Sequence, residues 1–278
     1  MDQPRRDATT ADSLPCVVLC DLDGVVWLAH QPITGSVQAI ADLRAAGHRV
    51  LFVTNNSGAR VEAQEASLAA IGIPAVGDVL TSANAAALLI EPGERVLVCG
   101  GEGVVQAVVG RGAIVVDDKM DDRVDVVIVG FHRTFDYDEM LYASRAARNG
   151  ARLIGTNDDA TYPTPDGPIP GGGAILASIV TAAGVVPIVA GKPHGPMAQL
   201  VRATVGDAAA TGAVMVGDRP ETDGLMAVTL GCRYAHVESG VTPPGTHVVP
   251  TPSIIAANLA GVAKVLLSVR AGRDSMPA

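Results

Sequence analysis

The chain has 278 residues, of which 48% are hydrophobic and 18% charged, a composition that excludes a disordered protein and favours a globular one. Its formal net charge of -9 argues against nucleic acid and anionic membranes as partners, because both attract basic proteins. The four cysteines lack the spacing of a zinc site, so we expect thiols in a reducing, cytoplasmic compartment.

Short apolar runs alternate along the chain with stretches of helical spacing, which is typical of βαβ units on a parallel sheet. The sequence predicts strands at residues 17–20, 49–53, 95–99, 124–129, 151–155, 187–190 and 213–216. The uncharged segment 171–191 has nearly the length of a membrane helix. Gly184 and Pro187 divide it, so we expect a helix followed by a buried strand instead of a membrane span.

Four of these strands end on polar residues. The endings are DLDG after 17–20, TNNSG after 49–53, GKPHG after 187–190 and GDRPETDG after 213–216. Because ligands bind beyond the carboxyl ends of parallel strands, four such ends on one sheet would meet at one site. The strands between Arg95 and Gly155 have no comparable endings, which indicates a second unit inserted between TNNSG and GKPHG.

In the first ending, Asp21 and Asp23 lie two residues apart and can face one point from an extended backbone. Two carboxylates this close repel each other and raise one pKa unless a cation intervenes. One ionised and one protonated group would make a nucleophile and a general acid. The alternative is a structural turn in which the aspartate side chains form hydrogen bonds with the backbone. An EF-hand is excluded, because Val26 and Pro32 occupy the positions of its glycine and its bidentate glutamate.

The second and third endings offer groups suited to phosphate oxygens. Thr54 brings a hydroxyl and Asn55 an amide, although Asn56 or Ser57 could instead cap the following helix. Lys192 could neutralise an anion, the alternative being a solvated surface charge.

GKPHG is not a P-loop, because Pro193 stands where Ser or Thr should follow the lysine. We expect His194, in the same ending, at the surface.

The fourth ending supplies Asp218 at the strand end and Asp223 at an expected helix start. Mg²⁺ prefers carboxylates, waters and phosphate oxygens, so Asp21 and Asp218 together could hold it. Asp223 has the alternative of a helix-dipole contact. A further motif, VLVCGGEGVV, is similar to a dinucleotide-binding loop, but Gln106 replaces its third glycine.

Taken in order, these motifs resemble the haloacid dehalogenase (HAD) superfamily of phosphohydrolases, and specifically its nitrophenylphosphatase-like subfamily IIA. The resemblance runs from about Pro15 to Thr242, and GTNDDATYPTPDG and PGGGAI are similar to cap motifs of that branch. It implies an α/β fold, with a Rossmann-like parallel-sheet core that carries a large inserted α/β cap. The corresponding division is a flexible tail at 1–13, a core at 14–83 and 187–270, a cap at 84–186, and a second flexible tail at 271–278.

The resemblance also implies the roles of the site residues. Asp21 would be the nucleophile that forms an aspartyl-phosphate, and Asp23 the general acid and then the base. Asp21, the Asp23 backbone carbonyl and Asp218 would hold Mg²⁺, with Asp223 supporting the metal. Thr54, Asn55 and Lys192 would bind the phosphoryl group, and Tyr162 of the cap would select the substrate, unless it is an interdomain packing residue.

The expected function is therefore hydrolysis of a small phosphorylated metabolite by a cytoplasmic, Mg²⁺-dependent phosphatase, with pairing of two chains through the cap. The alternatives are a phosphotransferase or mutase on the same fold, and a non-catalytic phosphate-binding regulatory protein. The sequence departs from the family pattern at Gly224, where an apolar residue is usual, and at His132, where the family commonly has aspartate. The second departure concerns the cap and its choice of substrate or partner.

Overall fold

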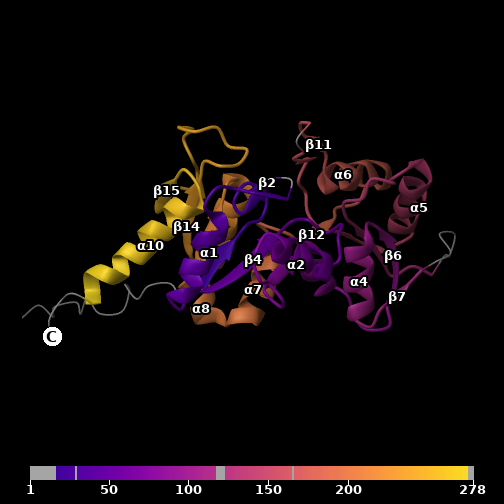
Figure 1. The fold of residues 1–278 in the computed structure, drawn as a ribbon. Coiled ribbons are helices and arrows are strands. Elements are labelled where there is room, and N and C mark those ends of the chain that lie inside the picture. The colour runs from indigo at the N-terminus through magenta and orange to yellow at the C-terminus, as the bar shows by residue number, and fades with distance from the viewer. Residues whose placement is uncertain (1–16, 29, 117–122, 165, 275–278) are drawn as a thin grey trace, which may run out of the picture.

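The fold consists of two parallel sheets, each covered by helices on both faces, in a computed structural model that describes residues 17–28, 30–116, 123–164 and 166–274. The predicted tail at 1–13 lies outside the described residues. Figure 1 shows the two units side by side, with the N-terminal and C-terminal segments in one lobe and the middle of the chain in the other. The chain therefore leaves the first unit and returns to it.

The larger sheet has six parallel strands in the order β15-β14-β13-β1-β4-β5. In that order they are β15 (Ile254–Ala256), β14 (Arg233–Val237), β13 (Val214–Gly217), β1 (Val17–Cys20), β4 (Arg49–Thr54) and β5 (Val79–Thr81). Strand β1 lies between β13 and β4, and its four residues are all buried. Asp21, the residue after β1, therefore lies at the middle of the sheet's carboxyl end.

Helices cover both faces of the larger sheet, because alternate strand residues point to opposite sides. Val18 and Cys20 pack with helices α1 (Ser36–Ala45), α2 (Val61–Ala70) and α10 (Leu259–Asp274). Val17 and Leu19 pack on the other face with α7 (Gly195–Val205), α9 (Leu225–Leu230) and α3 (Ser82–Ala87). The short helix α8 (Asp207–Thr211) follows α7.

The smaller sheet has five parallel strands in the order β12-β9-β8-β6-β7. They are β12 (Ile188–Val189), β9 (Arg152–Gly155), β8 (Val126–Val129), β6 (Arg95–Cys99) and β7 (Ile114–Val115). Helices α5 (Tyr137–Arg148) and α6 (Gly172–Ala183) cover one face, and α4 (Glu102–Gly110) covers the other. Two hairpins complete the described chain: β2 (Trp27–Leu28) with β3 (Gln31–Pro32), and β10 (Thr161–Tyr162) with β11 (Ile169–Pro170).

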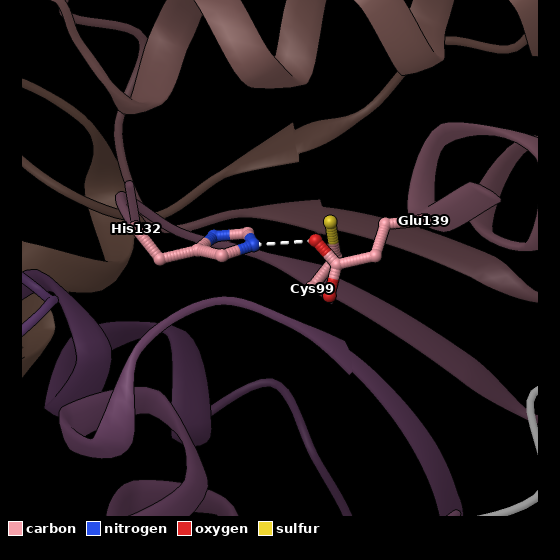
Figure 2. A group of neighbouring side chains, drawn as sticks. All are labelled: Cys99, His132 and Glu139. Carbon is pink, nitrogen blue, oxygen red and sulfur yellow. Dashed lines mark hydrogen bonds and ion pairs between the residues drawn. The ribbon is translucent and has the colours of Figure 1, made fainter. Parts of the chain in front are cut away.

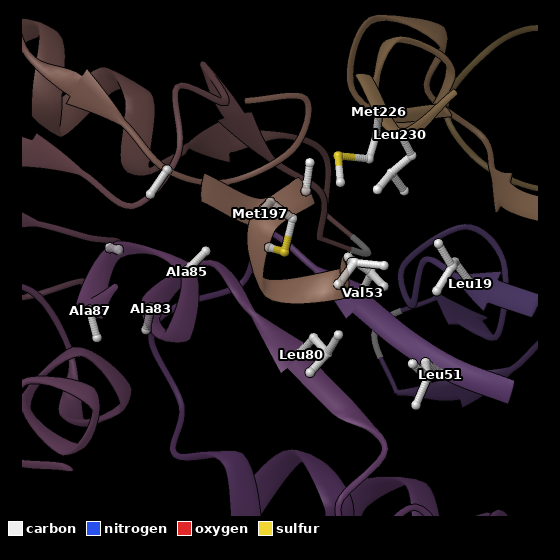
Figure 3. Close-up of a cluster of buried hydrophobic side chains, with 14 of the residues drawn as sticks. Leu19, Leu51, Val53, Leu80, Ala83, Ala85, Ala87, Met197, Met226 and Leu230 are labelled. Carbon is white, nitrogen blue, oxygen red and sulfur yellow. The ribbon is translucent and has the colours of Figure 1, made fainter. Parts of the chain in front are cut away.

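One apolar cluster extends across both units through helix α3. Its alanines Ala83, Ala85, Ala86 and Ala87 are buried between side chains of the larger sheet and those of β6, β8 and α4. Figure 3 shows this cluster, with Leu19, Leu51 and Val53 of the larger sheet on one side, the α3 alanines on the other, and Met197 of α7 between them. The small side chains of α3 allow the two units to pack closely.

The seven predicted strands are all present, and the α/β architecture of parallel sheets is confirmed. The prediction that the strand at 187–190 belongs to the larger sheet is wrong: β12 pairs with β9 in the smaller one. The tail predicted from residue 271 is also wrong at its start, because α10 continues to Asp274. Segment 171–191 is helix α6 followed by β12, and none of the described helices is long and apolar enough to cross a membrane.

The GGEG motif after β6 has a packing role. A Cβ on Gly103 would collide with the backbone carbonyl of Ala59 and would lie 2.6 Å from that of Ser57. A Cβ on Gly101 would collide with the Gly58 carbonyl in the same way. These glycines therefore allow the first turn of α4 to lie against the loop that follows β4, which joins the two units.

We expect Gly103→Ala to lower the free energy of unfolding by roughly 1–3 kcal/mol, because the added methyl group must push α4 away from the 57–59 loop. Gly110→Ala is the matched control, since it lies in the same helix with open space around its Cβ position. The control should be neutral or stabilising by ~0.4–1 kcal/mol. Urea titrations of both variants measure the difference, and equal midpoints would contradict the packing role.

Candidate active site

The end of β1 directs two carboxylates into one pocket. The Asp21 N–H donates to the Val216 carbonyl at 2.9 Å, which continues the strand pairing by one residue. Gly24 then turns the chain with φ at 85°, and its N–H donates to the Trp27 carbonyl at 2.8 Å. Asp21 and Asp23 both line the pocket. The interpretation of DLDG as a turn is thus correct for Gly24, while the two aspartates face the pocket.

Lys192 bridges two buried carboxylates. Its Nζ lies 2.8 Å from Asp21 Oδ1 and 2.7 Å from Asp223 Oδ1, and the residue is 1% exposed. Burial alone would lower the pKa of Lys192, but the carboxylates of Asp21 and Asp223 outweigh it and hold that pKa well above its usual range. The alternative of a solvated surface charge is therefore wrong, and a fixed positive charge lies beside Asp21.

Asn55 holds the Lys192 backbone in place although the lysine follows a strand of the other sheet. The Lys192 N–H donates to Asn55 Oδ1 at 2.8 Å, and Asn55 Nδ2 donates to the Lys192 carbonyl at 3.0 Å. The same Nδ2 lies 3.1 Å from Asp159 Oδ2. The side-chain amide of Asn55 is thus engaged by protein groups, and the four strand ends converge although only three belong to one sheet.

The loop after β4 connects with the smaller unit. Thr54, at 2% exposed, accepts a hydrogen bond from the Asn56 N–H at 3.1 Å and lines the pocket. Ser57 Oγ accepts from Thr156 Oγ1 at 2.9 Å and from the Phe131 N–H at 3.3 Å. Helix α2 begins later, after Arg60, so the alternative that Asn56 or Ser57 caps it is wrong.

The Asp218 carboxylate occupies space that is open only because Gly24 and Gly240 have no side chains. A Cβ on Gly24 would lie 2.6 Å from Asp218 Cγ, and a Cβ on Gly240 would collide with Asp218 Oδ2. That Oδ2 accepts a hydrogen bond from the Val241 N–H at 2.8 Å. The other oxygen, Oδ1, is buried and has no hydrogen-bond partner within the described part of the chain. A buried carboxylate oxygen in this state is suited to a cation.

Three carboxylates next to the pocket could hold a hard cation. Oxygens of Asp21, Asp218 and Asp223 all lie within 4.8 Å of one another. Burial, and then the charge of Asp21, raises the pKa of Asp218 to about 6. Carboxylate oxygens with water and phosphate are the ligands that Mg²⁺ prefers. The donor set therefore fits the predicted metal, and a cation there would remove the repulsion.

Asp223 is fixed by its neighbours more than Asp21 or Asp218. Its Oδ1 accepts from Lys192 Nζ, and its Oδ2 accepts the Arg219 N–H at 3.1 Å. It lies in a short π-helical turn, η1 (Pro220–Gly224), against Gly217, where any Cβ would collide with it. This arrangement is compatible with the supporting role predicted for Asp223. The unusual Gly224 also has a reason, because a Cβ there would lie 2.8 Å from Pro250 Cδ.

Asp23 differs from Asp21 in its environment. It is half-buried, and burial followed by the charges of Asp21 and Asp218 raises its pKa to about 7. Asp21, in contrast, has its Oδ1 2.8 Å from the buried Lys192 Nζ. The pair therefore consists of one carboxyl group that can be protonated near neutral pH and one carboxylate paired with a cation.

The smaller unit supplies the opposite wall of the pocket. The rings of Tyr162 and Phe131 stack with centroids 5.1 Å apart and planes at 19°. Gly171 and Gly172, at the N-terminus of α6, also line the pocket, so the positive end of a 12-residue helix begins at this wall. A ligand in the pocket would contact both units.

The pocket brings together most of the predicted site residues: Asp21, Asp23, Thr54, Asn55, Lys192 and Tyr162. Asp218 and Asp223 lie beside it through their contacts with Asp21 and Lys192. The sequence analysis missed further lining residues, namely Asn56, Phe131, Asn157, Asp159, Thr161 and Arg219. All except Phe131 lie within the motifs quoted from the sequence, but a motif does not tell which of its side chains face a pocket. His194 is half-buried and pairs with Asp158 at 3.0 Å.

Comparisons with known proteins identify similar sequences over most of the chain. Two family models match, one described as a haloacid dehalogenase-like hydrolase over residues 18–113 and the other as HAD-hydrolase-like over residues 189–262. An acid sugar phosphatase of Staphylococcus saprophyticus is 35% identical over 228 residues, which cover 81% of this chain and 86% of that protein. A D-glycerol 3-phosphate phosphatase of Mycobacterium tuberculosis is 38% identical over 229 residues, covering 81% of this chain and 63% of that protein.

Solved structures share the architecture as well. A p-nitrophenyl phosphatase from Archaeoglobus fulgidus has a TM-score of 0.84 at 27% identity, covering 91% of this chain and 100% of that one. The glycerol phosphate phosphatase from Mycobacterium tuberculosis in complex with magnesium has a TM-score of 0.81 at 34% identity, covering 92% of this chain and 79% of that one. The likeness therefore includes both sheets.

We expect Lys192→Met to lower the free energy of unfolding by roughly 3–5 kcal/mol in metal-free buffer, because it leaves two buried carboxylates without their cation. The double variant Lys192→Met/Asp223→Asn should lose less than the sum of the two single variants, since the amide removes one of the unpaired charges. Urea unfolding of all four proteins measures this coupling. Strictly additive losses would mean that the ion pair contributes nothing specific.

Proposed function

The chain belongs to the haloacid dehalogenase-like hydrolases, and from that premise we propose that it is a Mg²⁺-dependent phosphatase of small phosphomonoesters that works through an aspartyl-phosphate. The observation that carries the proposal is that Asp21, which lines the pocket, lies against a buried lysine and beside Asp218. Phosphoryl transfer needs a nucleophile in line, neutralisation of charge and positioning. These groups can supply all three.

In the first step the Asp21 carboxylate attacks phosphorus. A bond forms between an Asp21 oxygen and phosphorus while the bond from phosphorus to the ester oxygen breaks, and its electron pair goes to that oxygen. Asp23 gives its proton to the departing oxygen, so an alcohol leaves instead of an alkoxide. The half-buried position of Asp23 in the same pocket supports this role.

In the second step Asp23 acts as the base. Its carboxylate takes a proton from water while the water oxygen attacks phosphorus, and the bond between phosphorus and Asp21 breaks. Inorganic phosphate leaves, and both aspartates return to their starting states. One residue serves as acid and then as base because the first step leaves it ionised.

The phosphoryl oxygens would be bound by groups that the fold already holds in place. Lys192 offers a fixed charge, and Thr54 offers a hydroxyl at the end of β4. Asn55 acts chiefly by positioning Lys192, since its side-chain amide is engaged by the Lys192 backbone and by Asp159. When bound, Mg²⁺ at Asp21, Asp218 and the Asp23 carbonyl supplies charge neutralisation to the phosphoryl group.

The cap side of the pocket would select the organic part of the substrate. Tyr162, stacked on Phe131, is our candidate for that contact, and the polar groups of Asn157, Asp159 and Arg219 line the same space. Such a wall is suited to hydroxyl groups, which donate and accept hydrogen bonds. We therefore favour short polyol or sugar phosphates, in agreement with the substrates for which the related acid sugar and D-glycerol 3-phosphate phosphatases are named.

The domain division and the assembly belong to the same proposal. The larger sheet with its helices would be the core, and the smaller sheet with its helices, inserted between α3 and α7, the cap. We place the end of the cap after Val189 instead of at 186, because β12 pairs with β9. Pairing of two chains through the cap and a cytoplasmic location stay predictions, which light scattering and cell fractionation would test.

Phosphate release from a panel of phosphomonoesters tests the function directly. The purified protein should release phosphate from glycerol 3-phosphate or a sugar phosphate with Mg²⁺, and EDTA should abolish the release because the carboxylate cluster then lacks its cation. Asp21→Asn should be inactive and still folded, as circular dichroism would show. Absence of metal-dependent release from every ester would favour a binding protein, and phosphate appearing on an added alcohol would favour a phosphotransferase.

Asp23→Asn separates the acid role from the nucleophile. The first turnover of an alkyl phosphate should slow by ~10²- to 10⁴-fold, because its poor leaving group needs the proton. The first turnover of p-nitrophenyl phosphate should slow far less, since nitrophenolate leaves without protonation. Rapid-quench measurements on both esters give the ratio, and equal slowing of the two would contradict the acid role.

A further inference from the structure

A second cluster of metal-ligating side chains lies in the smaller unit, apart from the pocket. Cys99 ends β6, His132 follows β8, and Glu139 lies in the first turn of α5. Their ligand atoms, one from each residue, all lie within 4.8 Å of one another. Figure 2 shows the three side chains converging, with the Cys99 sulfur beside the Glu139 carboxylate.

We propose that Cys99, His132 and Glu139 bind a zinc ion. Thiolate, imidazole and carboxylate are the three ligand types that Zn²⁺ takes in proteins, whereas Mg²⁺ prefers oxygen alone. The cluster at Asp21 offers only oxygen, so the two sites differ in the metal that each selects. Three protein ligands leave the fourth position of a tetrahedral ion for water.

The histidine is oriented as a metal ligand requires. His132 Nδ1 lies 3.3 Å from the Gly130 carbonyl, which can only accept, so an N–H points to that side and Nε2 faces the cluster. Metal-binding histidines commonly donate their second ring N–H to a carbonyl or carboxylate in this manner. The Glu139 carboxylate and the Cys99 sulfur both lie on the Nε2 side of the ring (Figure 2).

The contact between His132 and Glu139 marks the place of the ion. Nε2 lies 2.6 Å from Glu139 Oε2, a distance at which a proton must lie between the two atoms. Zinc would replace that proton, and the two ligand atoms would then move apart to about 3.4 Å, as tetrahedral bonds of ~2.0–2.2 Å require. Binding therefore releases protons, because the shared proton must leave and the sulfur binds the metal as a thiolate.

The ligands come from parts of the fold that are already fixed. Cys99 is directly opposite Val129 in the paired strands β6 and β8, and the Gly130 N–H donates to the Cys99 carbonyl at 2.9 Å. The Glu139 N–H donates to Asp136 Oδ1 at 2.8 Å, where Asp136 caps α5. Only small side-chain movements are needed to bind the ion.

Two simpler interpretations explain less. An ion pair of His132 with Glu139 involves two of the three ligand atoms that lie within 4.8 Å of one another. A cysteine nucleophile activated by histidine would need the ring between the sulfur and the acid, but Nδ1 faces the Gly130 carbonyl and the other two groups share the Nε2 side. A shared metal uses all three groups.

The proposed site is connected with the pocket through one residue. Phe131, between Gly130 and His132, lines the pocket and stacks on Tyr162. An ion bound to His132 would fix the segment that presents this ring. The zinc site is thus placed to hold one wall of the pocket, while its existence does not depend on the reaction proposed above.

Titration with Co²⁺ tests the site, because a cobalt–thiolate bond gives a charge-transfer band in the near ultraviolet that oxygen ligands do not give. The full chain, without an affinity tag and with saturating Mg²⁺ at the carboxylate cluster, should develop this band up to one equivalent of Co²⁺. Added Zn²⁺ should remove it. Cys99→Ser should abolish the band, and Cys232→Ser, which changes a half-buried thiol elsewhere, should keep it.

A second measurement uses variants that keep the thiol. His132→Asn and Glu139→Gln should each weaken Zn²⁺ binding by at least ~10-fold in competition with a chelator, the loss seen for even the outer groups of metal sites. Zn²⁺ should raise the melting temperature of the natural protein in excess Mg²⁺ but not that of Cys99→Ser. No band in the natural protein, or a band that survives Cys99→Ser, would overturn the proposal and leave the phosphatase assignment unaffected.

Discussion

The buried ammonium of Lys192, between the carboxylates of Asp21 and Asp223, is the interaction on which the site depends. These residues come from three segments, after β1, after β12 and after β13. Taking one lysine and two carboxylates out of water is costly unless the charges face each other at short range. The segments must therefore meet in one geometry, and Asp21, the proposed nucleophile, is oriented by the same contact that holds these segments together.

That contact requires the smaller sheet to lie close to the larger one. Lys192 follows β12 of the smaller sheet, and Asn55 of the larger sheet binds its backbone N–H and carbonyl. The Ser57 hydroxyl and the glycines of α4 add further contacts across the same boundary. The same short polar contacts and glycines therefore hold the lysine in place and allow the two units to pack closely.

The two units offer different kinds of ligand atoms. The carboxyl edge of the larger sheet presents oxygen ligands and a fixed cation, which is suited to phosphate and Mg²⁺. The smaller unit presents aromatic and amide groups toward the pocket and, on its own sheet, the cluster of Cys99, His132 and Glu139. His132, the departure from the family pattern, belongs to that second cluster. The departure from the family pattern at His132 is therefore connected with the proposed zinc site and not with the proposed reaction.

The sequence by itself determined the strands and the chemistry at their ends, because apolar runs and the polar residues that follow them are local patterns. Asp21, Asp23, Thr54 and Lys192 were found in this way, and they share one pocket. Only the tertiary structure decided which sheet each strand joins, and β12 shows that a four-residue apolar run carries no such information.

The contacts made across the sheets were also outside the reach of the sequence. Asn55 hydrogen-bonds Lys192 and Asp159, and Cys99 lies near His132 and Glu139, although these residues are far apart in the chain. Arg219 lines the pocket only because of the direction in which its side chain points. Spacing along a chain specifies partners only within a helix, strand or turn. Partners brought together by packing are fixed by the close fit of the whole interior.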